Sequence, residues 1–290
     1  MKSKILVTGA NGQLGNELRE LAPSSGHQFY YTDIGQLDLT SETDTRKYLD
    51  SISPDYIINC AAYTAVDKAE SDAEQALAVN AVVPEILVAY ARDKKTRLIH
   101  ISTDYVFSGK GDTPLKETDV PGPESVYGRT KLIGEFIMES HPQSIIIRTS
   151  WLYSSYGKNF VKTMVGLMAE KKELQIVFDQ YGTPTYAADL AGAILQIIKS
   201  ADQNEDNFKP GYYHYSNEGS TTWFELAGEI KKFLGSGCVI HPVDTIDYPL
   251  PAPRPMYSVM SKEKIVKAYG IEIPSWKDSL EVCLKKMTDK

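Results

Sequence analysis

The feature that most constrains the fold is a regular alternation of short apolar segments with longer segments of helical periodicity. The apolar segments are continuous rather than alternating, which is typical of strands buried on both faces of a parallel sheet. Alternating strands and helices predict an α/β fold built on a doubly wound, mainly parallel Rossmann-type sheet. The expected strands are 4–8, 28–32, 56–60, 97–102, 144–149, 174–178 and 212–216, and the expected helices are 13–22, 42–52, 71–93, 125–139, 159–170 and 186–200.

The order of elements becomes less regular after about residue 201. A polar segment is followed by a helix whose start has Thr222 and Glu225 at capping-box spacing. The proline-rich segment DYPLPAPRP cannot form a regular helix or a central strand, and a last helix is expected near 276–287. We expect a smaller C-terminal α/β lobe that closes over the carboxyl edge of the sheet. The expected division is 1–150 for the Rossmann-type core, with 174–200 packing back on it, and 151–173 with 201–290 for the lobe.

Composition and charge exclude several classes of protein. The 290 residues carry a net charge of −7, so a nucleic-acid partner is not expected. Three cysteines form an odd set without metal-ligand spacing, which favours free thiols in a reducing compartment over disulfides. The N-terminal segment has no signal-peptide pattern, and no stretch approaches the roughly 20 apolar residues that span a bilayer. We therefore expect a cytoplasmic protein with no membrane partner.

The first expected strand leads into a glycine-rich loop, VTGANGQLG, with Gly9, Gly12 and Gly15. Glycine permits a tight turn there and lets a pyrophosphate approach the backbone, and the following helix offers unpaired amides to the phosphates. Asp33 ends the second expected strand, where a carboxylate can accept hydrogen bonds from an adenosine ribose. The loop spacing is GxxGxxG, and a plain turn at the loop or a turn cap at Asp33 is the alternative.

Two tyrosine–lysine pairs have the spacing of one helical turn, Tyr127 with Lys131 and Tyr90 with Lys94. Ligands of an open α/β sheet bind beyond the carboxyl ends of its strands. Thr103 lies at such an end and Tyr127 begins the next helix, whereas the second pair ends a helix at the opposite edge. We therefore interpret the second pair as a solvated helix end and the first pair as catalytic.

The first pair suits ketone reduction, in which carbon takes a hydride and oxygen takes a proton. The ordinary pKa of tyrosine is near 10, and an ammonium one turn away is expected to lower the pKa of Tyr127. Lys131 can also hold a cofactor ribose. Thr103 can hydrogen-bond the carbonyl oxygen.

At this point the chain resembles the extended short-chain dehydrogenase/reductase superfamily, through TGANGQLG, STDYVF and YGRTK. It resembles the dTDP-4-dehydrorhamnose reductase family within it more closely. That resemblance runs through nearly the whole chain, in NCAAYTAVDKAE, STDYVFSG, RTSWLYSSYGKNF, DQYGTPT and PAPRP.

The resemblance implies roles for matching positions. The pyrophosphate would contact the glycine loop with Gln13 and Leu14, and Thr103, Tyr127 and Lys131 would be catalytic. The remaining cofactor contacts would be Asp33, Asp38, Leu39, Ala61, Ala62 and Tyr63. The sugar nucleotide would contact Thr64, Val66, Thr103, Asp104 and Trp151. Arg254 is a further candidate for the substrate diphosphate, since a guanidinium pairs with phosphate oxygens, and a surface salt bridge is its alternative.

The chain departs from the family pattern in two places. Tyr63 stands where histidine is common, which we expect to be tolerated if the backbone makes the contact. Some members are magnesium-bound dimers, and Glu17, Asp189 and Glu263 lie near the relevant positions, but Asp189 replaces a longer glutamate. Magnesium is therefore left open and no metal site is predicted.

The expected activity is reduction of the C4 ketone of dTDP-4-dehydro-L-rhamnose with NADPH or NADH, by a monomer or a homodimer. An epimerase or dehydratase on the same scaffold is one alternative, although Tyr105 after Asp104 counts against a dehydratase. A regulatory subunit that binds dinucleotide without turnover is another, but it predicts a broken catalytic set.

Overall fold

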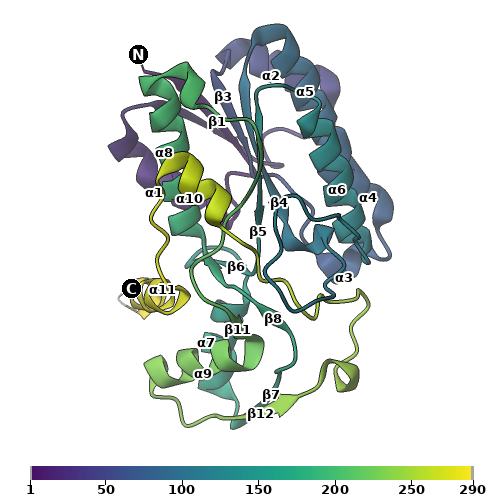
Figure 1. The fold of residues 1–290 in the computed structure, drawn as a ribbon, viewed down its shortest axis with the longest axis vertical. Coiled ribbons are helices and arrows are strands. Elements are labelled where there is room, and N and C mark those ends of the chain that lie inside the picture. Colours follow the sequence, from purple (N-terminus) through teal and green to yellow (C-terminus); the bar gives the residue numbers. More distant parts are fainter. Residues whose placement is uncertain (1, 289–290) are drawn as a thin grey trace.

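A six-stranded parallel sheet forms the centre of the molecule, as the sequence predicts. The computed structural model describes residues 2–288. The strand order β10-β5-β4-β3-β1-β2 reverses direction between β1 and β3 (Figure 1), which is where an open sheet leaves a crevice. The strands are β1 (Lys4–Thr8), β2 (Gln28–Thr32), β3 (Tyr56–Asn59), β4 (Arg97–Thr103), β5 (Ser144–Thr149) and β10 (Gly211–His214).

Helices cover both faces of this sheet. On one face α1 (Gln13–Ser25), α8 (Ala187–Gln203) and α10 (Glu263–Tyr269) share an apolar cluster with the strands. On the other face α2 (Glu42–Ile52), α5 (Val83–Lys94) and α6 (Val126–Glu139) enclose a second cluster. The central strands are fully buried because both of their faces are covered, which explains their continuous hydrophobicity.

The helix expected over 71–93 is present as a continuous helical run over 73–94, but it contains a π-helical turn that the sequence did not predict. The run consists of α4 (Ala73–Leu77), the π-helical segment η1 (Ala78–Val82) and α5, and the short helix α3 (Val66–Ala69) precedes it. The wide turn places the side chain of Asn80 against the backbone of Tyr63, where its Oδ1 accepts from Tyr63 N at 2.9 Å. A side-chain hydrogen bond to a loop is not visible in hydrophobic periodicity.

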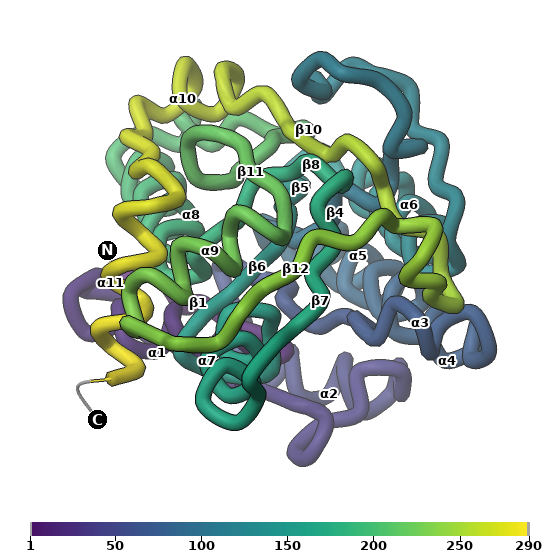
Figure 2. Tube along the Cα trace, turned by 90° about the horizontal axis from the view of Figure 1, so that it is seen from below, coloured from purple at the N-terminus to yellow at the C-terminus, as the bar shows by residue number. Residues whose placement is uncertain are grey.

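A smaller lobe lies below the sheet in Figure 1, and its elements β7, α9 and β12 lie in front in Figure 2; the lobe has its own apolar cluster. The strand expected at 174–178 belongs to this region: β7 pairs only with β12, outside the six-stranded sheet. Elements outside the central sheet and its helices are η2 (Asp104–Val106), β6 (Leu152–Tyr153), α7 (Phe160–Glu170), β7 (Glu173–Val177), β8 (Tyr181–Gly182), β9 (Thr185–Tyr186), η3 (Glu205–Asn207), β11 (Thr221–Thr222), α9 (Trp223–Leu234), β12 (Val239–Val243), η4 (Thr245–Asp247) and α11 (Trp276–Thr288).

Side-chain caps fix several helix starts. Ser125 Oγ accepts from Gly128 N at 3.0 Å at the start of α6, and the capping box of Thr222 and Glu225 starts α9.

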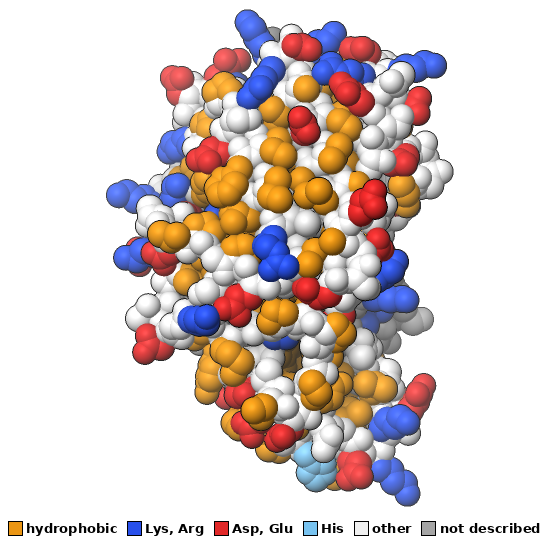
Figure 3. All heavy atoms as spheres, turned by 90° about the vertical axis from the view of Figure 1, so that its right-hand side faces the viewer, with side chains coloured by type: hydrophobic (Ala, Val, Ile, Leu, Met, Phe, Trp, Pro, Cys, Tyr) orange, Lys and Arg blue, Asp and Glu red, His pale blue; other side chains and the backbone are white. Residues whose placement is uncertain are grey.

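Figure 3 shows apolar side chains among charged ones on the face that carries α4 and α6. Phe136 of α6 is one of the exposed apolar residues. Within residues 2–288 no helix combines the length and apolarity needed to cross a bilayer.

Candidate functional site

The main cleft lies at the carboxyl ends of five parallel strands, where the sheet order reverses. It measures ≈ 930 Å³ and is lined by the residues that follow β1 to β5, together with α6 and part of the lobe. Every site residue predicted from the sequence lines it except Arg254: Gly9, Gly12, Gln13, Leu14, Gly15, Asp33, Asp38, Leu39, Ala61, Ala62, Tyr63, Thr64, Val66, Thr103, Asp104, Tyr127, Lys131 and Trp151. The fold thus brings together residues that are up to 142 positions apart (151 − 9).

The glycine loop has the geometry of a phosphate cradle. Gly9 has φ +61°, and a Cβ there would stand 2.7 Å from Ala61 N. A Cβ on Gly15 would stand 2.6 Å from Ala10 Cα, so this glycine lets α1 pack closely on the loop. Gly12 precedes α1 without a side-chain cap, which leaves the first amides of the helix to a ligand. The loop therefore fits the pyrophosphate of a dinucleotide.

Asp33 both stabilises this loop and faces the cleft. Its Oδ2 accepts from Asn11 N and its Oδ1 from Ile34 N, each at 2.9 Å. Asp38 Oδ1 accepts from Thr40 N and Thr40 Oγ1, and these hydrogen bonds lower the pKa of Asp38. Both carboxylates therefore also serve as turn caps, the alternative that the sequence left open for Asp33.

The loop after β3 forms the neighbouring wall. Ala61 N donates to Thr8 Oγ1 at 3.4 Å, and Asn80 accepts from the amide of Tyr63 and donates to its carbonyl. The Tyr63 hydroxyl instead donates to Asp72 Oδ2 at 2.9 Å. Tyr63 thus has its backbone held by Asn80, while its hydroxyl bonds Asp72, the residue that precedes α4.

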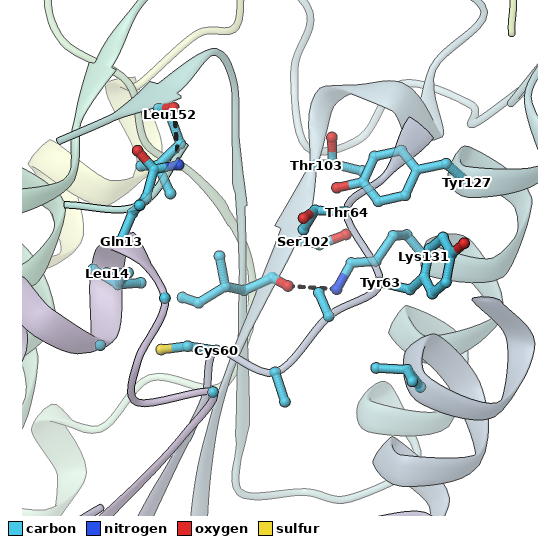
Figure 4. A pocket seen from close by; sticks show the side chains of 18 of the residues that line it. Gln13, Leu14, Cys60, Tyr63, Thr64, Ser102, Thr103, Tyr127, Lys131 and Leu152 are labelled. Atoms are coloured by element: carbon cyan, nitrogen blue, oxygen red, sulfur yellow. Dashed lines mark hydrogen bonds between the residues drawn. The ribbon is translucent and has the colours of Figure 1, made fainter. Parts of the chain in front are cut away.

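Thr103, Tyr127 and Lys131 meet at the end of β4 (Figure 4). Thr103 hydrogen-bonds the Tyr127 hydroxyl, which lowers the pKa of Tyr127, but burial raises it more, to about 12. Lys131 Nζ donates to Ile101 O at 2.7 Å. The pKa of Tyr127 is therefore raised and not lowered as expected from Lys131, because burial is the largest effect on this hydroxyl.

The second tyrosine–lysine pair is not a site, but the reason differs from the expected one. Tyr90 is a core residue, 1% exposed, and its hydroxyl donates to Leu49 O at 3.0 Å. Only Lys94 is solvated, and it pairs with Asp50 at 3.1 Å. The interpretation of the whole pair as a solvated helix end is therefore wrong for Tyr90, whose ring fills the space between α5 and α2.

The substrate side of the cleft is bounded by Asp104 and Trp151. Asp104 is 2% exposed, and burial raises its pKa to about 6 against the hydrogen bonds from Ser258 and Thr103 that lower it. Trp151 has φ +47°, an uncommon conformation for a tryptophan, and a Cβ on Gly182 would stand 2.5 Å from its ring. Gly182 therefore makes the room that the indole occupies.

A second cavity of ≈ 1040 Å³ adjoins the first and holds Arg254. The two share Tyr105, Trp151, Phe160 and Trp223. Arg254 donates to Asp67 Oδ2 at 2.7 Å, so the salt-bridge alternative that the sequence left open is present in the structure. Arg254 therefore lines the second cavity and not the main cleft.

The three acids near the family's metal positions do not converge. Glu17 accepts from Lys286 Nζ at 2.9 Å and from Ser154 Oγ at 2.5 Å, whereas Asp189 accepts from Asn217 and Ser279. Glu263 begins α10. Over residues 2–288 no group of three or more histidine, cysteine or acidic side chains is arranged to hold a metal ion.

Sequence reasoning missed several lining residues. Cys60, Lys158 and Trp223 line the main cleft, and His100 lies directly behind Lys131. Trp223 follows the Thr222 cap, which only indicated a helix start. His100 sits inside the apolar run RLIHIS, where a polar side chain was a signal that a buried partner must exist.

Comparison with known proteins assigns the chain to a family. The family model described as RmlD substrate binding domain matches residues 3–289. The dTDP-4-dehydrorhamnose reductase of Aggregatibacter actinomycetemcomitans is 38% identical over 96% of this chain and 97% of its own length. That of Escherichia coli K12 is also 38% identical, over 99% and 97%.

Solved structures agree with this assignment. The dTDP-4-dehydrorhamnose reductase of Bacillus anthracis in complex with NADP is 37% identical, covers 99% of this chain and 100% of its own, and has a TM-score of 0.93. The orthologue from Clostridium acetobutylicum is 38% identical over 98% and 99%, with a TM-score of 0.92. The likeness therefore extends through the core and the lobe alike.

Proposed function

This chain belongs to the RmlD substrate-binding-domain family of dTDP-4-dehydrorhamnose reductases, and from that premise we propose that it reduces the C4 ketone of dTDP-4-dehydro-L-rhamnose with NAD(P)H. The observation that carries the proposal is the meeting of Thr103, Tyr127 and Lys131 in one cleft with the glycine loop. A reductase needs a proton donor beside a dinucleotide, and this cleft is lined both by Tyr127 and by a loop that fits a dinucleotide.

The residues present fit a nicotinamide dinucleotide. The uncapped start of α1 and the Gly9 turn suit its pyrophosphate, and Asp33 and Asp38 face the adenosine end of the cleft. When bound, the reduced cofactor supplies the hydride that forms the new C–H bond at C4 of the sugar. The NADP complex of the Bacillus anthracis relative supports this class of cofactor.

Tyr127 supplies the proton in the proposed reaction. Because burial raises its pKa to about 12, the hydroxyl is protonated at neutral pH and is ready to donate. Thr103 holds the ketone oxygen beside that hydroxyl. As hydride reaches carbon, the O–H bond of Tyr127 breaks and its proton passes to the oxygen, leaving a phenolate, while the Lys131 ammonium would hold a ribose hydroxyl of the cofactor. The products are a secondary alcohol and the oxidised cofactor.

We further propose that the substrate lies between Asp104, Thr64, Val66 and Trp151, with its nucleotide toward the cavity of Arg254. We propose that the protein acts as a monomer or a homodimer. The cytoplasm is the proposed location because it supplies both the reduced cofactor and the sugar nucleotide.

The proposal is tested by mixing the protein with enzymatically generated dTDP-4-dehydro-L-rhamnose and following the loss of NADPH or NADH absorbance. We expect oxidation by the wild type and a loss of at least ~100-fold in kcat for Tyr127→Phe, the lower range for general acid catalysis. A wild type that binds dinucleotide but oxidises none would contradict the reductase. An epimerised sugar in that mixture would favour the epimerase alternative.

A further inference from the structure

A line of buried polar side chains crosses three central strands behind the catalytic lysine. Thr8 of β1, Asn59 of β3, His100 of β4 and Lys131 of α6 are each no more than 1% exposed. Thr8 is in register with Asn59, and Asn59 with His100, so the three side chains lie side by side across the sheet. Polar groups are costly in such a place unless they bond one another.

The four side chains form an unbroken hydrogen-bonded row. Thr8 Oγ1 lies 2.6 Å from Asn59 Oδ1, and Asn59 Nδ2 lies 3.0 Å from His100 Nδ1. His100 Nε2 then lies 3.3 Å from Lys131 Nζ. The row leads from β1, the strand before the glycine loop, to the lysine of the catalytic set. The proposed reaction assigns no role to its other three members, Thr8, Asn59 and His100.

The protonation of Lys131 decides how the row must be arranged. An ammonium has three donors and no acceptor, so His100 Nε2 must accept from it and the imidazole must carry its proton on Nδ1. That proton needs an acceptor. The structure places the Asn59 amide with its nitrogen toward His100 and its oxygen toward Thr8, so the inferred tautomer requires this amide to be turned by 180°, which makes its oxygen the acceptor of the Nδ1 proton. The amide nitrogen then donates to Thr8 Oγ1. The opposite arrangement, with the proton on Nε2, requires a neutral Lys131 amine.

We infer that His100 is a positioning residue for Lys131: its neutral imidazole, protonated on Nδ1, accepts from the ammonium and keeps it charged and aimed at the cleft. With Ile101 O and His100 Nε2 each taking one N–H bond, the third remains for a ligand hydroxyl in the cleft. Asn59 in the turned orientation accepts the Nδ1 proton, and the Thr8 hydroxyl, which can donate or accept, bonds the other end of the amide. This role rests on the proposed function, in which Lys131 acts as a cation.

The charges around Lys131 show why such support is needed. Burial lowers the pKa of Lys131 to about 8, while Glu135 of α6 and Cys60 after β3 raise it. Arg148 of β5 forms an ion pair with Glu135, with its Nη2 2.7 Å from Glu135 Oε2. Burial and the charge of Lys131 lower the pKa of His100 well below 6.5, so the imidazole stays neutral and serves as an acceptor. The neutral Tyr127 hydroxyl adds no charge at neutral pH.

The tautomer can be read directly, without turnover. In wild-type protein labelled with ¹⁵N-histidine, long-range ¹H–¹⁵N spectra distinguish a protonated Nδ1 from a protonated Nε2. The signals of His100 are those lost in His100→Gln. We expect a protonated Nδ1 and a bare Nε2 at neutral pH. A protonated Nε2, or an imidazolium, would overturn the inference whether or not the protein reduces the sugar.

Kinetics give the second readout. In His100→Leu the ammonium loses its acceptor, so the upper limb of the kcat/KM–pH profile should move down by about one pH unit. His100→Gln keeps an acceptor oxygen and should retain the limb. His141→Leu is the matched control, because His141 is also buried (4% exposed) but bonds Thr96 O away from the cleft.

The inference fails if His100→Leu folds, binds the cofactor and keeps the upper limb of the wild-type kcat/KM–pH profile. It also fails if His141→Leu moves that limb by the same amount. If His100→Leu does not fold, the tautomer of His100 in the wild type decides the inference, with the histidine signals assigned through His100→Gln.

Discussion

The indole rings of Trp151 and Trp223 stack face to face, with centroids 3.5 Å and planes 10° apart, at the boundary between the two cavities. Trp223 Nε1 donates to Gln180 Oε1 at 3.1 Å, and Gln180 in turn donates to Thr245. Trp151 is thus held in its left-handed backbone conformation by a ring that is itself fixed to the lobe. This arrangement couples the proposed sugar platform to the segment that leads to Arg254.

Trp223→Leu should therefore weaken substrate binding without weakening cofactor binding. We expect KM for the sugar nucleotide to rise roughly tenfold, the effect of losing one aromatic pair, because Trp151 no longer stacks on Trp223. The dissociation constant of NADPH, measured by fluorescence titration, should stay within about twofold on the same reasoning. Trp223→Phe keeps a ring and should recover most of the KM. An unchanged KM in the leucine variant would remove Trp223 from substrate positioning.

The carboxylate of Asp33 sets a prediction on cofactor choice. Asp33→Asn keeps an oxygen that accepts from Asn11 N but removes the negative charge beside the proposed ribose site. We expect the ratio of kcat/KM for NADPH to that for NADH to rise about tenfold, because a 2′-phosphate no longer meets a like charge at the surface. Steady-state kinetics with both cofactors measure the ratio. An unchanged ratio would mean that Asp33 acts only as a loop cap.

Asp104 makes stability depend on pH. The pKa of Asp104 is raised from 3.8 to about 6 in the folded protein, so the unfolded chain loses this proton at lower pH. The contribution of Asp104 to the free energy of unfolding should therefore fall as pH rises from about 4 to 6. Asp104→Asn cannot ionise, so its advantage over wild type should grow over that window and level off above it, at no more than about 3 kcal/mol. Urea denaturation of the cofactor-free protein at several pH values gives this difference. A constant difference across the window would contradict the assigned pKa.

The buried ion pair of Arg148 and Glu135 joins β5 to α6. Two hydrogen bonds, at 2.9 and 2.7 Å, connect the side chains, which are 3% and 0% exposed. Arg148→Met leaves a buried, unpaired carboxylate and should lower the free energy of unfolding by about 3–5 kcal/mol. Adding Glu135→Leu should restore much of it.

The matched control for that pair is an exposed one. Lys94 and Asp50 pair at 3.1 Å with more than half of each side chain exposed, so Lys94→Met should leave the urea midpoint unchanged. If Arg148→Met and Lys94→Met lowered the free energy of unfolding equally, burial would not determine the contribution of the Arg148–Glu135 pair.

The sequence predicted the sheet and the helices that cover it because these rest on local patterns, such as the continuous apolar strands and the Thr222–Glu225 capping box before α9. Most of the lining of the main cleft was instead implied by the family resemblance. Pairing partners are not local: LQIVF reads equally well as a strand of either sheet, and only tertiary packing puts β7 beside β12. The π-helical turn at Asn80 was invisible for the same reason.

The candidate site shows the same division. Motif order located Thr103, Tyr127 and Lys131, but not the direction of the Lys131 amine, which depends on Ile101 O and His100. A histidine within an apolar run reads as an interruption of the strand. Its meaning appears only when parallel register places it beside Asn59.

The most direct test of the proposed reduction follows one atom. NADPH dideuterated at nicotinamide C4 is mixed with dTDP-4-dehydro-L-rhamnose and the protein, and the sugar product is examined by NMR and mass spectrometry. The account predicts one deuterium, bonded to C4 of dTDP-L-rhamnose, with one NADP⁺ formed for each sugar reduced. A sugar recovered without deuterium while the protein binds NADPH would contradict hydride transfer at this site.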